Sequence, residues 1–103
     1  MIELNEQFFD EGTREGLVLV DFFANWCGPC RAISPTLEQL KGIKVVKVDT
    51  DESPNLAVRF KVSSIPCLVI MKDGVEVDRM IGVQSLQMLQ ERVDKWNVEA
   101  SFS

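Results

Sequence analysis

Trp26-Cys27-Gly28-Pro29-Cys30 is the most informative segment of the sequence, because it holds two thiols two residues apart beside a proline. Just upstream, the apolar run over residues 17–23 predicts a buried strand. Downstream, apolar side chains recur at helical spacing at Ile33, Leu37 and Leu40. The thiol pair is therefore expected at a strand-to-helix junction, with Cys27 at the start of the helix and Cys30 one turn inside it.

This placement favours redox chemistry at the two thiols. Free backbone amides and the helix dipole at a first turn favour negative charge, so the thiolate of Cys27 is stabilised over its thiol. Cys30 is close enough in sequence to close a small disulfide ring with Cys27. The alternative, that Cys27 is an inert buried thiol, fits this position less well because reactive thiols occur at helix starts.

The composition is that of a single globular domain spanning residues 1–103, with residues 98–103 expected to form a frayed tail. Apolar residues make up 46% and charged residues 26%. The net charge of −5 argues against nucleic-acid binding, which needs clustered Lys and Arg. No apolar run approaches the roughly 18 residues that span a bilayer, so no membrane association is expected. If Met1 is the natural start, the absence of a secretory signal favours a cytoplasmic location.

Cysteine and histidine counts limit the metal chemistry. The chain has three cysteines and no histidine. An odd number is unlike a disulfide framework, and structural zinc needs four Cys or His ligands. No metal site is therefore expected. An iron–sulfur cluster shared between two copies of the chain is a more distant alternative.

Hydrophobic periodicity and turn residues predict a mixed sheet with helices on both faces. Pro35 lies inside the second predicted helix, and an Asp-Gly pair at 73–74 predicts a hairpin. The expected strands are 2–4, 17–24, 43–49, 67–71 and 75–81. The expected helices are one capped by Asn5 that ends near Gly16, one over 27–41, one over 54–60 capped by Ser53, and one capped by Ser85 that runs to about Asn97.

With these elements in place, the chain resembles the thioredoxin family over nearly its whole length, from about Ile2 to Asn97. The resemblance rests on Val20-Asp21-Phe22, Trp26-Cys27-Gly28-Pro29-Cys30, Pro35, Lys47-Val48-Asp49, Ser64-Ile65-Pro66, Asp73-Gly74 and Gly82. It implies an α/β thioredoxin fold, in which a central mixed five-stranded sheet is flanked by four helices and the last two strands run antiparallel to the rest.

The resemblance also implies an activity, the reduction of disulfides in client proteins. The reversible Cys27–Cys30 disulfide would be the redox centre, without a bound cofactor. Electrons would come from NADPH through a thioredoxin reductase, and the protein would act as a monomer. Two alternatives from other classes remain open: the same fold used as a scaffold subunit with incidental thiols, and a thiol-ligated metal or iron–sulfur carrier.

In this family pattern Cys27 is the nucleophile and Cys30 the resolving thiol, expected to be less exposed and less acidic than Cys27. Asp21 interrupts the apolar strand, and a buried carboxylate is costly unless it is paired or protonated. The resemblance implies that Asp21, with an elevated pKa, accepts the proton of Cys30 through water. A structural ion pair between Asp21 and Lys47 is the alternative, and the two are compatible.

The resemblance further implies a substrate groove around the thiols, made by Trp26, Gly28, Pro29, Ile65, Pro66 and Gly82. Gly28 would allow a tight turn, Pro29 would stiffen the loop, and the Ile65–Pro66 bond would be cis. Plain structural interpretations compete with these: Trp26 as ordinary core, Pro66 as the first residue of a strand, and Gly82 as a turn glycine.

Two residues depart from the family pattern. Cys67 follows Pro66 where threonine is usual, which puts a third sulfur at the edge of the expected groove. It is interpreted as a small buried strand residue. The alternatives are a regulatory thiol, a glutathione acceptor, or a competitor that forms an off-pathway disulfide with Cys27. Phe23 stands where many members have tryptophan, a change expected to alter packing more than chemistry.

Overall fold

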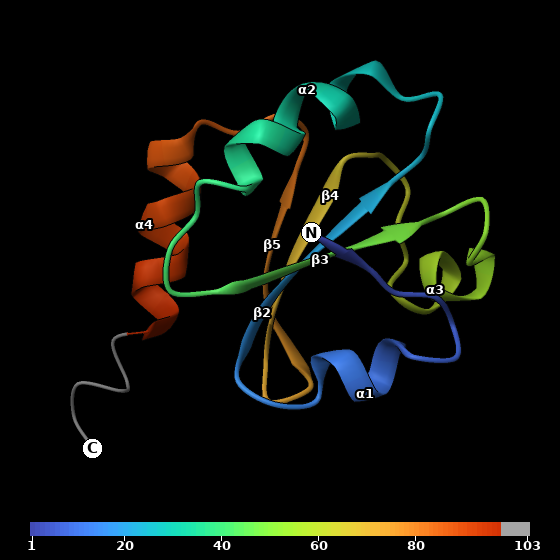
Figure 1. The fold of residues 1–103 in the computed structure, drawn as a ribbon, viewed down its shortest axis with the longest axis horizontal. Coiled ribbons are helices and arrows are strands. Elements are labelled where there is room, and N and C mark those ends of the chain that lie inside the picture. The colour runs from blue at the N-terminus through green and yellow to red at the C-terminus, as the bar shows by residue number, and fades with distance from the viewer. Residues whose placement is uncertain (98–103) are drawn as a thin grey trace.

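The structure is a computed structural model, and it describes residues 1–97. Five strands and four helices alternate along the described chain (Figure 1). In order these are β1 (Ile2–Glu3), α1 (Phe9–Thr13), β2 (Leu17–Phe23), α2 (Gly28–Leu37), β3 (Lys44–Asp49), α3 (Pro54–Arg59), β4 (Cys67–Lys72), β5 (Val75–Ile81) and α4 (Leu86–Asn97). The expected tail at 98–103 lies outside the described residues.

The five strands form one mixed sheet in the order β1-β3-β2-β4-β5. β1, β3 and β2 are parallel, β4 is antiparallel to β2, and β5 is antiparallel to β4. The expectation that both of the last two strands oppose the rest was wrong. Only β4 does, because the hairpin that follows it reverses the chain again and returns β5 to the direction of β2.

Helices cover both faces of the sheet, and each face has its own apolar core. On one face, side chains of β2, β3 and β4 pack with Phe9 of α1 and Leu56 of α3. On the other, strand side chains pack with Ile33 and Leu37 of α2 and with Leu89 of α4. Burial of apolar surface on both faces is the main stabilising contribution to this arrangement.

The side chains of β2 alternate between the two faces of the sheet, so neighbouring residues pack against different helices. Successive side chains of a strand point to opposite faces. Val18, Val20 and Phe22 belong to the core under α1 and α3, whereas Leu19 belongs to the core under α2 and α4. Asp21 has the same parity as Leu19, so its carboxylate lies on the α2 face of the sheet.

Two helices are shorter than the sequence pattern predicts. The side chain of Asn5 accepts hydrogen bonds from the amides of Gln7 and Phe8, at 3.0 and 3.1 Å, but it caps a turn that precedes α1. Helix α2 ends at Leu37, and the next residues continue in tighter turns, in which the amide of Leu40 donates to the carbonyl of Leu37.

The turn signals in the second half of the chain are confirmed. Asp73 and Gly74 both have positive φ angles, 49° and 86°, as a two-residue hairpin of this handedness requires. Ser85 caps α4, accepting a hydrogen bond from the amide of Met88 at 3.1 Å. Chain segments therefore enter and leave the sheet where these local signals indicate.

Candidate active site

Cys27 and Cys30 form a disulfide where the chain passes from β2 into α2, the helix at the top of Figure 1. Cys27 is the N-cap of α2, with extended backbone angles, and Pro29 lies in the first turn. The amide of Cys30 donates a hydrogen bond to Sγ of Cys27 at 3.2 Å. The first cysteine therefore takes the place that a serine or aspartate oxygen occupies in a common helix cap.

Both cysteines are buried in this oxidised form. Cys27 is 4% exposed and Cys30 is 3% exposed, and the pair packs against Ala24, with Phe23 and Ile65 beside it. The expected difference in exposure between the two cysteines is absent here. Each sulfur covers part of the other when they are bonded, so the disulfide presents a small apolar surface.

Gly28 does not make the tight turn that was expected of it. It is the first residue of α2, and it is not among the described glycines with positive φ. A Cβ at this position would have only the guanidinium of Arg31 near it, at 4.0 Å. The absence of a side chain therefore leaves space open beside the disulfide, and backbone geometry does not demand a glycine.

A shallow groove of about 520 Å³ lies beside the disulfide. It is lined by Trp26, Cys27, Gly28, Pro29, Ser63, Ser64 and Ile65. Trp26 is 71% exposed, so it is a wall of the groove and the core interpretation is wrong. Its indole Nε1–H donates to a carboxylate oxygen of Asp51 at 3.0 Å, which holds the exposed ring in place.

The remaining two predicted groove residues lie next to this groove and are not part of its lining. The Ile65–Pro66 peptide bond is cis, as the resemblance implied. The amide of Gly82 donates to the carbonyl of Pro66 at 2.9 Å, which ties the ends of β4 and β5 together. Gly82 has a φ of 87°, a conformation that L side chains rarely adopt, so the residue is a glycine for backbone reasons.

Asp21 is buried on the α2 face of the sheet, where it is 1% exposed. Burial raises the pKa of Asp21 to about 7, and the positive charge of Lys47 opposes that rise only in part. Its Oδ1 has no hydrogen-bond partner among the described residues. A carboxyl group with such a pKa changes its protonation near neutral pH, as a proton-transfer group must.

Lys47 lies opposite Asp21 in the parallel β2–β3 pairing. The two side chains do not form a direct ion pair within residues 1–97, so the expected structural ion pair is absent. The ammonium of Lys47 lies over the ring of Phe23 instead, 5.0 Å from its centroid. Lys47 therefore acts on Asp21 through space, while the aromatic face holds its charge.

A second, smaller cavity of about 90 Å³ connects Asp21 to the cysteine pair. It is lined by Asp21, Phe23, Cys30, Arg31, Ser34 and Lys47. A cavity of this volume with a carboxyl, a hydroxyl and an ammonium group in its lining has room for a small number of water molecules. The buried carboxyl and the second cysteine therefore face the same small aqueous space.

Cys67 is buried at the start of β4 and is 1% exposed. It packs in the core beneath α1 and α3, so the expected position at the edge of the groove was wrong. Burial raises the pKa of the Cys67 thiol. These surroundings favour the interpretation as a small core residue over that as an accessible regulatory thiol.

Several residues that shape the site carry no strong sequence signal. Asp49 is buried, and its carboxylate accepts hydrogen bonds from the amides of Asp51 and Glu52 at 2.9 and 3.4 Å and from the side chain of Asn25 at 3.5 Å. It thereby joins the loop that bears Trp26 to the loop that bears Asp51. The family resemblance includes Asp49 at the end of a strand but implies no role for it. Ser34, which lines the small cavity, has no feature in the sequence that predicts a role at the site.

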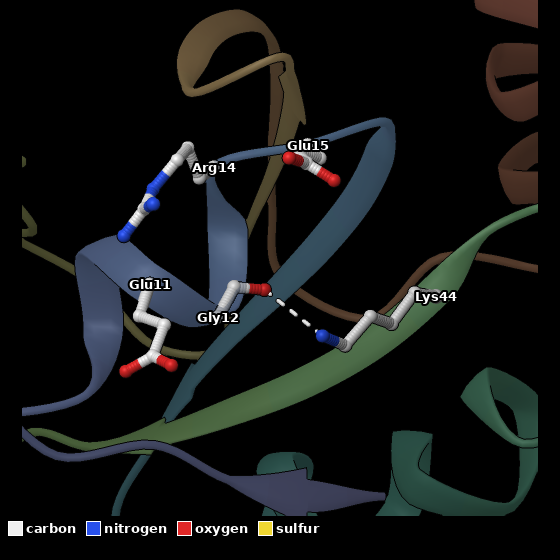
Figure 2. Close-up of a pocket in the computed structure, with 5 residues that line it drawn as sticks. All are labelled: Glu11, Gly12, Arg14, Glu15 and Lys44. Carbon is white, nitrogen blue, oxygen red and sulfur yellow. Dashed lines mark hydrogen bonds between the residues drawn. The ribbon is translucent and has the colours of Figure 1, made fainter.

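Other hollows and charge clusters in residues 1–97 do not match this chemistry. One hollow near the end of α1 is lined by Glu11, Gly12, Arg14, Glu15 and Lys44, and there Lys44 Nζ already donates to the carbonyl of Gly12 at 3.0 Å (Figure 2). Carboxylates of Glu3, Asp49 and Glu52 gather within 4.8 Å of one another. Both oxygens of Asp49 already accept hydrogen bonds, Oδ1 from the amides of Asp51 and Glu52 and Oδ2 from the side chain of Asn25. No described helix has the length and hydropathy needed to cross a membrane.

Comparisons with known proteins agree with this geometry. The Thioredoxin family model matches residues 1–95. A thioredoxin from Staphylococcus haemolyticus is 43% identical over 100 residues, covering 92% of this chain and 96% of its own length. One from Listeria monocytogenes is 43% identical over 99 residues, covering 91% and 96%. A solved structure of a mutant thioredoxin from Halobacterium salinarum superposes with a TM-score of 0.85 at 30% identity, covering 91% of this chain and 88% of that one.

Fold, disulfide and relatives therefore agree, and the expected thioredoxin fold is confirmed. Thioredoxins are thiol–disulfide oxidoreductases that use a redox-active disulfide and no bound cofactor. The disulfide at the start of α2 matches that dithiol couple in residue spacing and in position. The chain belongs to the thioredoxin family, with Cys27–Cys30 as its redox pair.

Proposed function

We propose that Cys27 is the thiol that attacks client disulfides. The observation that carries this assignment is the hydrogen bond from the amide of Cys30 to Sγ of Cys27 at 3.2 Å, at the positive end of α2. In the reduced protein the same amide would donate to a thiolate and stabilise it over the thiol. Attack forms a mixed disulfide between Cys27 and the client, and releases the client's other sulfur as a thiolate.

Cys30 then resolves the mixed disulfide. Its thiol loses a proton, its sulfur bonds to Cys27, and the bond between Cys27 and the client breaks. Asp21 accepts that proton through water in the small cavity that both residues line. Its raised pKa of about 7 supports this role, because such a carboxylate can take up and release a proton near neutrality.

Lys47 adjusts the pKa of Asp21, the proposed proton acceptor. Its positive charge lowers the pKa of Asp21 and so keeps part of the carboxyl population ionised near neutral pH. The Phe23 ring supports Lys47 in the position from which it acts.

Clients bind in the groove beside the disulfide. Trp26, Pro29 and Ile65 supply an apolar contact surface, and the missing side chain at Gly28 lets a client chain approach the sulfurs. Pro66 and Gly82 hold the wall behind Ile65 through their backbone hydrogen bond. A client segment in extended conformation would fit this shallow surface.

The finer assignments follow from family membership. The clients are proteins with accessible disulfides, and an NADPH-dependent thioredoxin reductase returns electrons to the Cys27–Cys30 pair. We propose that residues 1–103 form one domain that works as a monomer in the cytoplasm.

Insulin reduction with dithiothreitol tests the assignment. The wild-type protein should accelerate precipitation of the insulin B chain, and Cys27→Ser should not. Cys30→Ser should accumulate a covalent complex with the client, because the first step still occurs and the second cannot. If Cys30→Ser forms no such complex while Cys27→Ser does, the two roles are reversed. If wild type gives no acceleration, the disulfide-reductase function fails and the two alternatives remain, a scaffold subunit or a thiol-ligated metal carrier.

A further inference from the structure

The small cavity beneath α2 contains a hydroxyl group that the proposed mechanism does not use. Ser34 lines this cavity together with Asp21 and Cys30. It follows Cys30 by four residues in α2, so both side chains project from the same face of the helix. This face covers the part of the sheet in which Asp21 lies.

Two polar groups at this cavity lack a protein partner. Within residues 1–97, the Ser34 hydroxyl forms no hydrogen bond, and neither does Oδ1 of the buried Asp21 carboxyl. Buried waters persist where they find two to four polar partners. A hydroxyl, a carboxylate oxygen and a sulfur around one small space provide such a set.

We infer that Ser34 is a positioning residue, whose hydroxyl holds the water through which Cys30 passes its proton to Asp21. The inference rests on the proposed function of Asp21 and adds a residue to it. A serine hydroxyl both donates and accepts, so it can keep the same water in place before and after the proton moves.

The proton-transfer step is balanced without a further reactant. The Cys30 thiol gives its proton to the water, and the water gives a proton to the Asp21 carboxylate. The Cys30 sulfur then bonds to the Cys27 sulfur, and the client sulfur leaves as a thiolate. Ser34 is neither protonated nor deprotonated overall.

Charged and titratable groups face Asp21 from each element packed around it. These are Lys47 on β3 and Cys30 and Arg31 on α2, whereas Cys67 on β4 lies on the opposite face of the sheet. Burial and the charge of Lys47 set the pH at which Asp21 ionises. Ser34 is uncharged, so removing its hydroxyl is expected to lower the rate of resolution while leaving the pH midpoint close to its wild-type position.

Stopped-flow reaction with Ellman's reagent separates the two chemical steps. Attack by Cys27 releases one coloured thiolate, and resolution by Cys30 releases a second from the mixed disulfide. We expect Ser34→Ala to slow the second release by roughly three- to tenfold. This is less than the rate loss expected when a general base itself is removed, because Ser34 only positions the water. The first release should stay within about twofold of wild type, because the hydroxyl takes no part in it. Ser34→Thr, which keeps the hydroxyl, should restore the second rate.

Thr36→Ala, which also removes a half-buried hydroxyl from α2, is the matched control and should leave both rates unchanged. In an Asp21→Asn background, Ser34→Ala should have no additional effect. If Asp21→Asn slows resolution but Ser34→Ala does not, the inference fails and the proposed relay stands. If Asp21→Asn itself has no effect, the relay fails and the inference fails with it. Equal slowing by Ser34→Ala in both backgrounds would also overturn the role given to Ser34.

Discussion

Asp21 and Lys47 occupy paired positions on β2 and β3, yet their side chains make no direct ion pair within the described residues. Lys47 lies over Phe23 instead, and the carboxylate of Asp21 is buried with one oxygen unpartnered. This separation has an energetic consequence. A contact ion pair would hold the pKa of Asp21 low, whereas a distant positive charge leaves burial as the dominant effect.

Replacing Asp21 with Asn should stabilise the fold at alkaline pH. The pKa of Asp21 is about 7 in the folded protein, above the ordinary value of 3.8 for an aspartate in an unfolded chain. Between these values the unfolded chain binds fewer protons than the folded one, so the Asp21 contribution to stability falls as the pH rises and reaches its minimum above the folded pKa. We expect Asp21→Asn to gain on the order of 2–4 kcal/mol relative to wild type at alkaline pH, and much less below the unfolded pKa.

Urea denaturation of both proteins, at a pH below about 4 and again above about 8, measures this difference. The same variant should slow resolution by Cys30 about tenfold or more, since it lacks the proton acceptor. A stability difference that does not change with pH would contradict the raised pKa.

Lys47→Met should move the pH dependence of resolution upward. Removing the positive charge takes away the influence that lowers the pKa of Asp21, so a larger share of the carboxyl is protonated at neutral pH. A shift of the midpoint by roughly half a unit to one unit is expected. Stopped-flow rates over a pH series give the midpoint. Lys44→Met is the matched control, since Lys44 lies on the same strand but pairs with Val18 and bonds to Gly12.

Asp51→Ala should weaken client binding while leaving the rate of disulfide exchange at Cys27 unchanged. Without the carboxylate the exposed Trp26 indole loses its hydrogen bond, and the wall of the groove is free to rotate. We expect KM for a protein client to rise roughly threefold to tenfold, as the loss of one hydrogen bond to a charged group allows. The rate with a small disulfide reagent should be unchanged. Glu52→Ala, which removes the neighbouring carboxylate, should alter neither value, and an equal effect from both variants would point to charge rather than positioning.

Cys67 should resist modification in the native protein. Its side chain is almost fully buried and the pKa of its thiol is raised, so little reactive thiolate is present or accessible. After reduction, iodoacetamide should label Cys27 first, and Cys67 only when the protein unfolds. Mass spectrometry of peptides taken over time distinguishes the sites. Glutathione or iodoacetamide attached to Cys67 before unfolding would support the regulatory alternative.

Asp49→Ala should destabilise the protein and disturb both loops beside the disulfide. The carboxylate of Asp49 accepts from two backbone amides and from Asn25, and its removal leaves these part-buried hydrogen-bond donors without their acceptor. A loss of about 1–3 kcal/mol in the free energy of unfolding is expected. Asp49→Asn retains an acceptor oxygen and should recover most of it. Denaturation curves of the two variants provide the comparison, and equal losses in both would indicate that the charge of Asp49 matters more than its acceptor geometry.

Much of the site could be predicted from local sequence. Cys27 lies at the start of α2 because an apolar strand precedes the cysteine pair and an amphipathic helix follows it. Asp73 and Gly74 determine their turn through backbone preferences that neighbouring residues scarcely alter. The chemistry of the thiol pair follows from these local placements.

Other features of the site depend on contacts between segments that are distant in the sequence, and local patterns do not predict them. The side of the sheet that Cys67 faces, the exposure of Trp26 and the cavity shared by Asp21 and Ser34 each depend on elements that are far apart in the chain. Sequence alone determined that the chain forms this alternating fold with a dithiol at a helix start, because the hydrophobic pattern and the backbone preferences are local. Tertiary structure decided how acidic the buried carboxyl is and what it can reach, because desolvation and electrostatic fields come from whatever packs around a group in space.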